Sequence, residues 1–471
     1  MIGTLVGGLL AIVASQPAPP VTFAADVAPI IRSHCVSCHR PDGDAPFSLL
    51  TFDDVRRRAS MIAAVTKRRY MPPWKPVPGF GEFHGSRRMT DAEIATIERW
   101  VKSGMAEGIG TVRLKPDAPL SAPEPDLVIE LPTYTLRADG PDVFRNFVVP
   151  VPGTARIVRG LQFRPRNRAV HHANIRIDAT TASRQLDEAD PEPGYEGVIA
   201  RSADFPDGQF LGWTPGQMAP LPSDDTAWRL AAGSDLVVQL HLRPTGAVEH
   251  IAPIVGIYFG DREPAVTPTM IRLGRQDLDI PAGAASHTVT DTFVLPVAVE
   301  ALAIQAHAHY RARSVEATAT LPDGSQRPLL RIDDWDINWQ DRYRYQRPVP
   351  LPAGTRITST YVFDNSIGNP RNPDRPPARS RWGWRSSDEM ADVWLQVRTT
   401  SAPDRARLRR EITAKMLKED AIGSEVLLER EPGHLHLQND AAQIYLALGQ
   451  PARALTHFEA ARKLEPSSAA A

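Results

Sequence analysis

Cys35-Val36-Ser37-Cys38-His39 is the most informative stretch of this 471-residue chain. In a C-x-x-C-H pentapeptide the two thiols attach a porphyrin covalently, and the following histidine ligates its iron. The chain has only these two cysteines, so no thiol is left for a disulfide or a zinc site. The competing interpretations are a chance C-x-x-C pair and a thioredoxin-like redox pair. We expect one covalent haem c on Cys35 and Cys38, with His39 as an iron ligand.

Residues 24–106, which surround the pentapeptide, have the pattern of a small helical domain. Thr90-Asp91-Ala92-Glu93 is a capping box, which predicts that a helix begins after Thr90. Apolar residues then recur at helical spacing as far as Gly104, a residue type that commonly ends helices. The segment resembles a small class I-like cytochrome c domain.

The sixth ligand of such a haem iron is expected to be a Met or His from a loop. Met71 lies in Arg69-Tyr70-Met71-Pro72-Pro73-Trp74, where the prolines hold the thioether in a fixed loop. We therefore predict Met71 as this ligand. Met61, Met89 and His84 remain alternatives, and packing alone is the other role open to Met71.

The first 14 residues, MIGTLVGGLLAIVA, are apolar and are followed by small residues and by Gln16-Pro17. The stretch is too short to span a bilayer but suits the apolar region of a signal peptide. No basic residue precedes it. We therefore expect residues 1–23 to be either a signal peptide with a late start or an uncleaved membrane anchor. Together with covalent haem attachment, this leader predicts a periplasmic or otherwise extracytoplasmic protein.

Charge and composition exclude some classes of partner. The formal net charge of −1 gives no field that would attract nucleic acid or anionic lipid. Proline accounts for 44 of the 471 residues, which favours short strands and fixed loops over long helices. A chain of this length is expected to form two to four domains, each with its own core.

Residues 107–126 are predicted to be a linker because four of them are proline. Beyond it the pattern changes to short apolar and β-branched runs, separated by turn signals such as Pro322-Asp323-Gly324. About 270 residues with this pattern predict two antiparallel β-sandwiches. We place them at residues 127–268 and 269–400.

From Ala402 onward the pattern is helical again, and residues 404–467 have the spacing of a tetratricopeptide repeat. The matching positions are Ala442, Tyr445, Ala454, Phe458, Ala461 and Pro466. One repeat cannot bury its own apolar face, so residues 404–430 or another chain must cover it. An ordinary amphipathic hairpin is the alternative. In both cases we expect a module that packs or docks a protein partner and carries no chemistry. The whole chain is thus predicted to be multidomain, with an all-α haem domain, two antiparallel β-sandwiches and an α-helical tail.

Five histidines and one methionine of the β region form an ordered pattern. Strand side chains alternate, so His307 and His309 face the same side and can bind one ion. His171 and His172 would face opposite sides of a regular strand, so both can bind one metal only at a bulge or a strand end. Imidazole suits copper, and a thioether favours Cu(I). We expect two copper ions, the first at His171, His172 and His241, the second at His307, His309 and Met390. An isolated strand histidine is more often a core or surface residue, so the argument depends on the ordered set.

The ordered set HH, QLH, HAH and SSDEM is similar to that of the copper type II, ascorbate-dependent monooxygenases. This family contains the peptidylglycine α-hydroxylating and dopamine β-hydroxylating enzymes. The resemblance covers roughly residues 125–400 and implies two jelly-roll-like sandwiches that face each other across a cleft. It also implies an electron-storing copper at the first set and an oxygen-activating, catalytic copper at His307, His309 and Met390. Asp364-Asn365-Ser366 and the Asp336–Tyr343 stretch resemble more distant bacterial members, several of which join a haem segment to the copper core.

Three positions depart from the peptide-amidating members of that family. Those members bind the substrate carboxylate with Arg, Asn and Tyr at the positions that are Gln305, Asp392 and Trp394 in this chain. Because a cation is missing and an acid is present, we expect a peptide C-terminus to be repelled. The cysteines that crosslink the animal enzymes are also absent, so the sandwiches depend on packing alone.

Two functions remain open. The first is a monooxygenase that hydroxylates a small organic substrate with O2, with electrons relayed from the haem to the first copper and on to the second. An external reductant or another cytochrome would load the haem. The second is a non-enzymatic electron carrier whose β region binds copper or is an inert scaffold. A hydrolase is disfavoured because the chain has no H-E-x-x-H motif, no G-x-S-x-G motif and no Gly-rich phosphate loop.

Overall fold

A computed structural model describes residues 20–41, 45–115, 123–197, 199–200, 202–206, 208–209, 211–214, 222–223, 226–263, 267–385 and 387–465. Most of the expected leader, the middle of the expected linker, Ser386 and Pro466 lie outside the described residues. Within the part of the chain that is described, no helix is both long and apolar enough to cross a bilayer.

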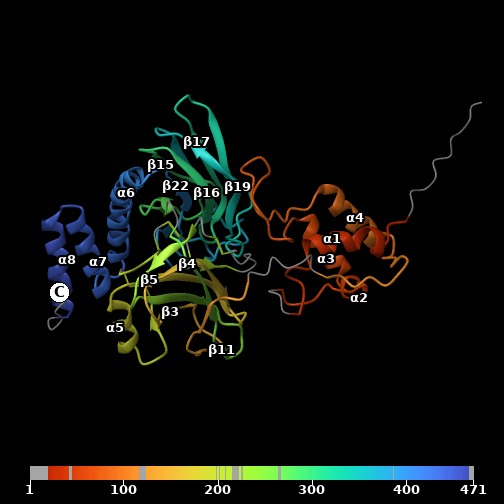
Figure 1. Cartoon of the computed structure of the whole chain (residues 1–471), viewed down its shortest axis with the longest axis horizontal. Helices are drawn as coiled ribbons and strands as arrows, with labels where there is room; N and C mark the ends of the chain where they lie inside the picture. The colour runs from red at the N-terminus through yellow and green to blue at the C-terminus, as the bar shows by residue number, and fades with distance from the viewer. Residues whose placement is uncertain are drawn as a thin grey trace, which may run out of the picture. The chain divides into compact units, whose positions relative to one another are not determined.

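The chain forms two compact units, and each is described by itself. The N-terminal unit comprises Met1–Trp74 and Arg87–Pro119, and the C-terminal unit comprises Lys75–Ser86 and Leu120–Ala471. Helices make up the first, and the second is mostly β-sheet and ends in three helices (Figure 1). The expected haem segment 24–106 is therefore interrupted, because residues 75–86 belong to the other unit.

The N-terminal unit is built from short helices around one apolar core. They are the π-helix η1 (Phe23–Val27), α1 (Ala28–His34), α2 (Phe52–Arg56), α3 (Ala59–Lys67) and α4 (Asp91–Lys102). Helix α4 begins where the capping box predicts. The Thr90 hydroxyl accepts from the Glu93 amide at 3.2 Å, and the Glu93 carboxylate accepts from the Thr90 amide at 2.7 Å. Gly104, at φ +92°, follows its end in the left-handed conformation.

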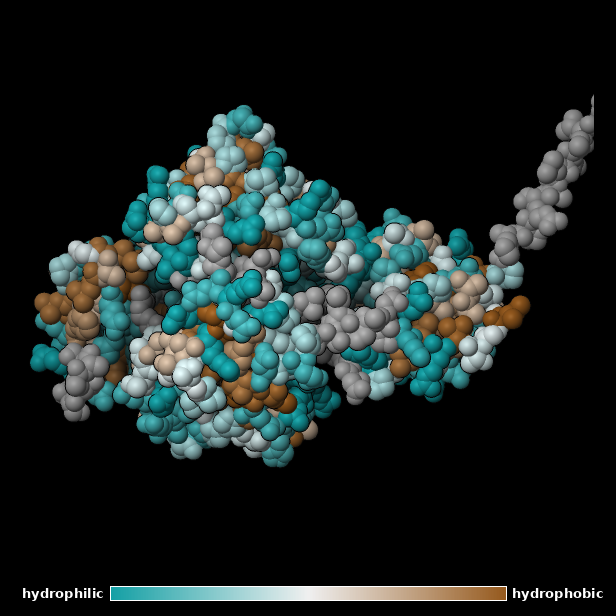
Figure 2. Space-filling model, in the orientation of Figure 1, coloured by the Kyte–Doolittle hydropathy of each residue, from teal (hydrophilic) through white to brown (hydrophobic). Residues whose placement is uncertain are grey.

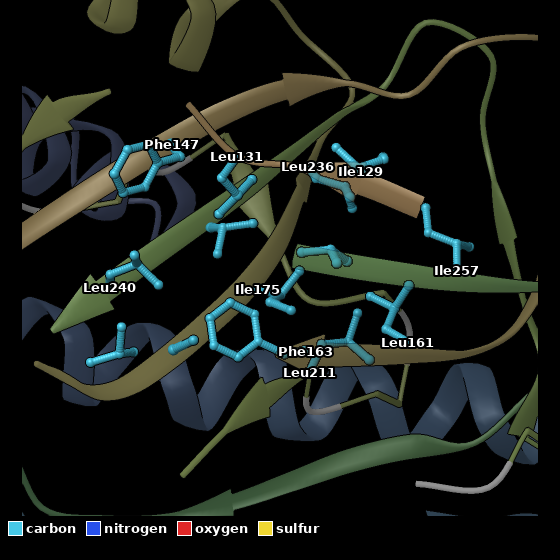
Figure 3. Packing of buried hydrophobic residues seen from close by; sticks show 14 of the residues in the cluster. Ile129, Leu131, Phe147, Leu161, Phe163, Ile175, Leu211, Leu236, Leu240 and Ile257 are labelled. Atoms are coloured by element: carbon cyan, nitrogen blue, oxygen red, sulfur yellow. The ribbon is translucent and has the colours of Figure 1, made fainter. Parts of the chain in front are cut away.

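The first β region (residues 127–260) contains two main sheets that share one core. One sheet has the order β1-β12-β4-β9, and the other has the order β6-β3-β10-β5-β7 with β8 also paired to β5. Figure 3 shows side chains such as Phe147, Phe163 and Leu236 meeting between the strands. The elements are β1 (Leu127–Glu130), β2 (Tyr134–Leu136), β3 (Val143–Pro150), β4 (Arg156–Arg164), β5 (Val170–Asp178), α5 (Ala182–Ala189), β6 (Tyr195–Glu196), β7 (Ala203–Asp204), β8 (Gly212–Trp213), β9 (Trp228–Leu230), β10 (Asp235–Leu242), β11 (Glu249–Ile251) and β12 (Ile254–Gly260).

The second β region (residues 269–398) also contains two main sheets, and here each is four-stranded and antiparallel. Their orders are β13-β22-β16-β19 and β15-β20-β17-β18, and β14 and β21 form a separate two-stranded sheet. The strands are β13 (Thr269–Leu273), β14 (Asp279–Ile280), β15 (His287–Val294), β16 (Val299–His307), β17 (Ala312–Thr320), β18 (Gln326–Ile332), β19 (Arg342–Leu351), β20 (Arg356–Phe363), β21 (Ser380–Arg381) and β22 (Asp392–Arg398). The prediction of a β-rich middle is confirmed. The jelly-roll-like topology and the boundary near residue 268 stay predictions.

The tail consists of α6 (Ala402–Leu428), α7 (Leu435–Ala447) and α8 (Pro451–Leu464). The apolar face shared by α7 and α8 packs on Leu417 and Ala421 of α6. The Tyr445 hydroxyl donates to the Glu425 carboxylate at 2.7 Å. Residues 404–430 thus cover the hairpin, which was one of the two expected solutions.

Part of the tail's surface stays apolar. Leu446 and Leu455 are 51% and 58% exposed, and Figure 2 shows hydrophobic residues gathered over the tail helices. An exposed apolar surface of this kind is compatible with the expected protein partner. Membership of the tetratricopeptide class stays a prediction.

Residues 75–86, which we call the strap, are bound along the second β region. The amide of Val77 donates to the Arg331 carbonyl at 2.8 Å, and the amide of His84 donates to the Arg344 carbonyl at 2.8 Å. The Phe83 ring packs against Tyr343 and Tyr345 in the same unit, with centroids 5.3 and 5.1 Å apart. The strap is therefore part of the C-terminal unit by contact, although the haem motif precedes it in sequence.

Candidate metal centres

The first set of histidines lies on two neighbouring strands of the first β region. His171 and His172 are on β5, and His241 is on β10. His241 pairs with His172, but the next pair is Leu242 with Val170, so His171 is the extra residue of a β-bulge. This bulge is the feature that the sequence required for two adjacent histidines to point at one site.

The three imidazoles converge through their Nδ1 atoms. Nδ1 of His172 lies 3.3 Å from that of His171 and 3.4 Å from that of His241. Two nitrogens that bind one ion at roughly 2.0–2.1 Å, in trigonal or tetrahedral geometry, would lie about 3.3–3.6 Å apart. One ligand atom from each of the three residues lies within 4.8 Å of the others. The spacing therefore fits a shared metal ion.

The outward nitrogens of two of these rings are held by polar side chains. The Asp142 carboxylate lies 2.7 Å from Nε2 of His241, and because a carboxylate only accepts, that nitrogen carries the proton. The Asn338 amide oxygen lies 3.3 Å from Nε2 of His171. Each contact leaves Nδ1 of the same ring with its lone pair free for a metal, which is the usual arrangement around metal-binding histidine.

Burial keeps His171 and His172 uncharged. Desolvation, followed by the proximity of His241, lowers the pKa of His171 to about 4. Desolvation also lowers the pKa of His172 well below its ordinary value, with the other histidines adding to the effect. Neutral imidazole is the form that binds a metal.

The second set of histidines lies at the end of β16. The rings of His307 and His309 have centroids 5.3 Å apart, which agrees with the predicted shared face. Nδ1 of His307 contacts the Gln340 amide oxygen at 2.6 Å, and Nδ1 of His309 donates to the Asp388 carbonyl at 3.0 Å. Both rings therefore keep Nε2 for a metal. Burial is the largest cause that lowers the pKa of both rings, that of His309 to about 3.

The backbone at Met390 is held close to the segment that bears these histidines. His307 and Asp392 are the last pair of the ladder between β16 and β22, and beyond it the amides of His309 and Met390 both donate to the Glu389 carboxylate. The side chain of Met390 is half-buried. The backbone therefore brings the segment that bears Met390 close to the segment that bears the second pair of imidazoles.

Glu389, which the sequence did not single out as a functional residue, ties these segments together. Its fully buried carboxylate accepts hydrogen bonds from the amides of His309, Arg311 and Met390, the last two at 2.8 and 3.2 Å. Burial raises the pKa of Glu389 to about 7, against the opposing effect of these amides. One side chain thus fixes the backbone of a predicted histidine ligand and of the predicted methionine ligand. Its only sequence signal is its place beside Met390.

A cation of the tail supports the same segment. Arg430 contacts both carboxylate oxygens of Asp388, at 2.6 and 3.3 Å, and Asp388 is the residue whose carbonyl accepts from His309. Arg381 pairs with Glu429, and Arg385 pairs with Glu431. The loop before Met390 is therefore bound to the tail by three ion pairs.

Asp392, the acid that the sequence predicts to repel a substrate carboxylate, faces the cation of Arg272. Nε of Arg272 lies 3.6 Å from the Asp392 carboxylate, and Arg272 also reaches Asp420 of α6 at 3.1 Å. Desolvation raises the pKa of Asp392, and Arg272 opposes that shift. The electrostatic case against a carboxylate substrate is therefore weaker than the sequence indicated, because a cation faces the acid.

The haem motif follows directly after α1 and turns tightly. The amide of His39 donates to the Cys35 carbonyl at 2.9 Å. Nδ1 of the His39 ring lies 3.1 Å from the Phe47 carbonyl, which leaves Nε2 free for iron. Burial, followed by the proximity of Cys38, raises the pKa of the Cys35 thiol to about 12. Such a thiol is unlike the acidic thiol of a redox-active C-x-x-C pair.

Met71 lies with Met89 at a small hollow of about 10 Å³ in the N-terminal unit, which Trp74 also lines. Both methionines therefore stay candidates for the sixth ligand. Met61 is 44% exposed on α3, and His84 belongs to the strap of the other unit.

Comparison with known proteins adds no identity. No protein-family model matches the chain, and no curated protein matches it. Solved structures with some likeness include the major capsid protein P2 of bacteriophage PM2, with 11% identity over 55% of this chain and 97% of that chain and a TM-score of 0.25. Others are the VP2 subviral particle of infectious bursal disease virus (11%, 60% and 74%, TM-score 0.18) and a Paenibacillus xanthan lyase (11%, 60% and 28%, TM-score 0.16). Likeness at this level carries no argument about this chain.

Proposed function

We propose that this chain is an extracytoplasmic monooxygenase that uses one covalent haem c and two copper ions to hydroxylate a C–H bond of a small organic substrate with O2. One observation carries the proposal. Three imidazoles converge through Nδ1, and two more present Nε2 beside the segment that bears Met390. Imidazole and thioether are ligands suited to copper. The similarity of the ordered motifs to copper type II monooxygenases adds support.

In this proposal each part of the chain has one task. The N-terminal unit is a cytochrome c-like domain with Cys35, Cys38, His39 and Met71 at the haem. The β regions are two jelly-roll-like copper domains, and the tail is a tetratricopeptide-like module for a protein partner. Copper at the second set would supply the oxygen chemistry, with electrons passing to it one at a time from an external donor through the haem and the first set.

Polar groups of the chain engage one nitrogen of each of four imidazole rings and leave the other nitrogen available to a metal. The Asp142 carboxylate, the Asn338 and Gln340 amide oxygens and the Asp388 carbonyl each engage the nitrogen that a metal would not use. Each of the four rings therefore keeps the tautomer whose other nitrogen is free to bind a metal. Buried neutral rings are also spared competition from protons near neutral pH.

The metal content of the purified full chain tests the proposal directly. We expect two copper ions per haem and uptake of O2 when the protein is reduced. Zero or one copper per haem, without O2 uptake, would instead support the non-enzymatic electron carrier. Copper is measured by elemental analysis and haem by its pyridine haemochrome.

Replacement of Met390 tests the second site. Met390→Ile removes the thioether but keeps an apolar side chain of similar volume. We expect the haem spectrum and the first copper to persist while reduced protein stops consuming O2, because the second ion loses its soft ligand. Met416→Ile is the control, since Met416 is also half-buried in the C-terminal unit but lies on α6, away from the histidine strands. Unchanged O2 uptake by Met390→Ile would refute the role of Met390.

A further inference from the structure

One short loop contacts an imidazole of each metal set. The loop is Asp336–Gln340, between β18 and β19 of the second β region. The Asn338 amide oxygen lies 3.3 Å from Nε2 of His171, a first-set residue. Two residues later, the Gln340 amide oxygen lies 2.6 Å from Nδ1 of His307, a second-set residue.

Local hydrogen bonds fix which end of each amide faces the imidazole. The Asn338 nitrogen donates to the Asp336 carboxylate at 2.8 Å, so its oxygen must face His171. The Gln340 nitrogen donates to the Ile337 carbonyl at 2.8 Å, so its oxygen must face His307. Both imidazoles therefore donate to this loop and keep their other nitrogen bare.

The loop is also buried, and hydrogen bonds within it connect its residues. Asp336 and Gln340 are 5% and 4% exposed, and the Asp336 carboxylate also accepts from the backbone amide of Asn338 at 3.0 Å. The Thr214 hydroxyl of the first β region donates to the Gln340 carbonyl at 2.9 Å. Rotation of the Asn338 side chain would disturb the same turn that positions Gln340.

We propose that the Asp336–Gln340 loop couples metal binding at the two sets, so that an ion bound at one set raises the affinity of the other. This inference rests on the proposed copper sites. An ion at the first set fixes the His171 ring, which fixes Asn338 and the turn, and the turn then presents Gln340 to His307. An ion that restrains His171 also restrains the loop that orients His307, so the second ion loses less side-chain freedom on binding.

Thermodynamic linkage makes the coupling measurable from either side. The factor by which copper at the first set tightens the second must equal the factor by which copper at the second set tightens the first. Couplings of this kind usually amount to roughly 5-fold to 150-fold in Kd.

The experiment uses the haem-loaded full chain, freed of copper and titrated anaerobically with Cu(I) against a chromophoric chelator. His241→Ala disables the first set and reports the Kd of the second set alone. His309→Ala disables the second set and reports the Kd of the first alone. We expect each isolated Kd to exceed its value in the intact chain by the same factor.

A variant of the Asp336–Gln340 loop tests whether the contact between Asn338 and His171 carries the coupling. Asn338→Ala removes the contact to His171, and we expect a two-site titration of this variant to show independent sites. Thr214→Val is the control, because it removes a hydrogen bond to the same loop without touching an imidazole, and it should keep most of the coupling.

Failure of the coupling and failure of the proposed copper sites would give different titration results. Two bound copper ions with independent affinities in the unmodified chain would overturn the coupling and leave the proposed function standing. A coupling factor that survives Asn338→Ala would also overturn it, as would equal losses in Asn338→Ala and Thr214→Val. Fewer than two copper ions would overturn both proposals.

Discussion

His241 keeps one ring nitrogen for a metal because Asp142 occupies the other. The two residues lie 99 positions apart in sequence and belong to neighbouring parts of the first β region. His171 has the same arrangement: its Nε2 contacts Asn338, which lies 167 positions away in sequence. At each ring a polar partner decides the tautomer.

Asp142→Asn tests this role at a single atom. An amide can donate as well as accept, so the variant no longer forces the proton onto Nε2 of His241. We expect Cu(I) affinity at the first set to fall roughly 10-fold to 100-fold, which is typical when a ligand's hydrogen-bond partner is changed.

Asp139→Asn is the matched control, because the Asp139 side chain is 89% exposed. It should leave the Kd unchanged. Equal affinities for Asp142→Asn and the unmodified chain would remove Asp142 from the description of the site. The electron paramagnetic resonance signal of the Cu(II) form gives an independent reading of the ligand field.

Much of the candidate site was predictable at the residue scale, and the reasons for the remainder are physical. The HxH spacing predicts a shared strand face, and the adjacent pair His171-His172 requires a bulge or a strand end to bind one metal, because strands alternate with period two. Asp142, Asn338, Gln340 and Glu389 act through contacts between distant segments. No periodicity marks such residues, although the Asp336–Tyr343 stretch did stand out by resemblance.

At the scale of elements, a loop of the second β region depends on the tail. The loop from Arg381 to Asp388 precedes Met390, and residues 429–431 directly follow the C-terminal end of α6. Arg430 is the central contact, because its partner Asp388 is only 5% exposed and also receives the His309 ring through its carbonyl. A segment predicted to be a docking module without chemistry thus supports a candidate metal ligand.

Arg430→Leu tests that support. Removal of the cation leaves the Asp388 carboxylate buried without its partner, which should lower the free energy of unfolding by about 3 kcal/mol. We also expect Cu(I) affinity to fall more at the second set than at the first. Denaturant unfolding and the chelator titration measure the two effects.

Arg453→Leu provides the comparison within the tail. Arg453 is 58% exposed and contacts Glu425 at 3.3 Å, so its loss should cost less than about 1 kcal/mol. If Arg453→Leu and Arg430→Leu weaken copper binding equally, the tail acts through general stability rather than through Asp388.

At the scale of the whole molecule, the order of helical and β-rich segments was predictable, but the division of the chain was not. Composition and periodicity place helices at both ends and strands between them. They cannot show that Lys75–Ser86 leaves the N-terminal unit, because the strap is held by backbone hydrogen bonds and by Phe83 against two distant tyrosines. Such contacts leave no local signature in the sequence.

The strap changes what a single cut in the backbone would do. Cleavage at a protease site engineered into residues 116–122 would leave the strap in the amino-terminal fragment. The strap would still be hydrogen-bonded to the second β region, which lies in the other fragment. We expect the fragment that contains Cys35 and Cys38 to co-elute with the remainder on size-exclusion chromatography and to separate only in denaturant. Phe83→Ala in the nicked protein should release it more readily, in the manner of a weakened fragment complex.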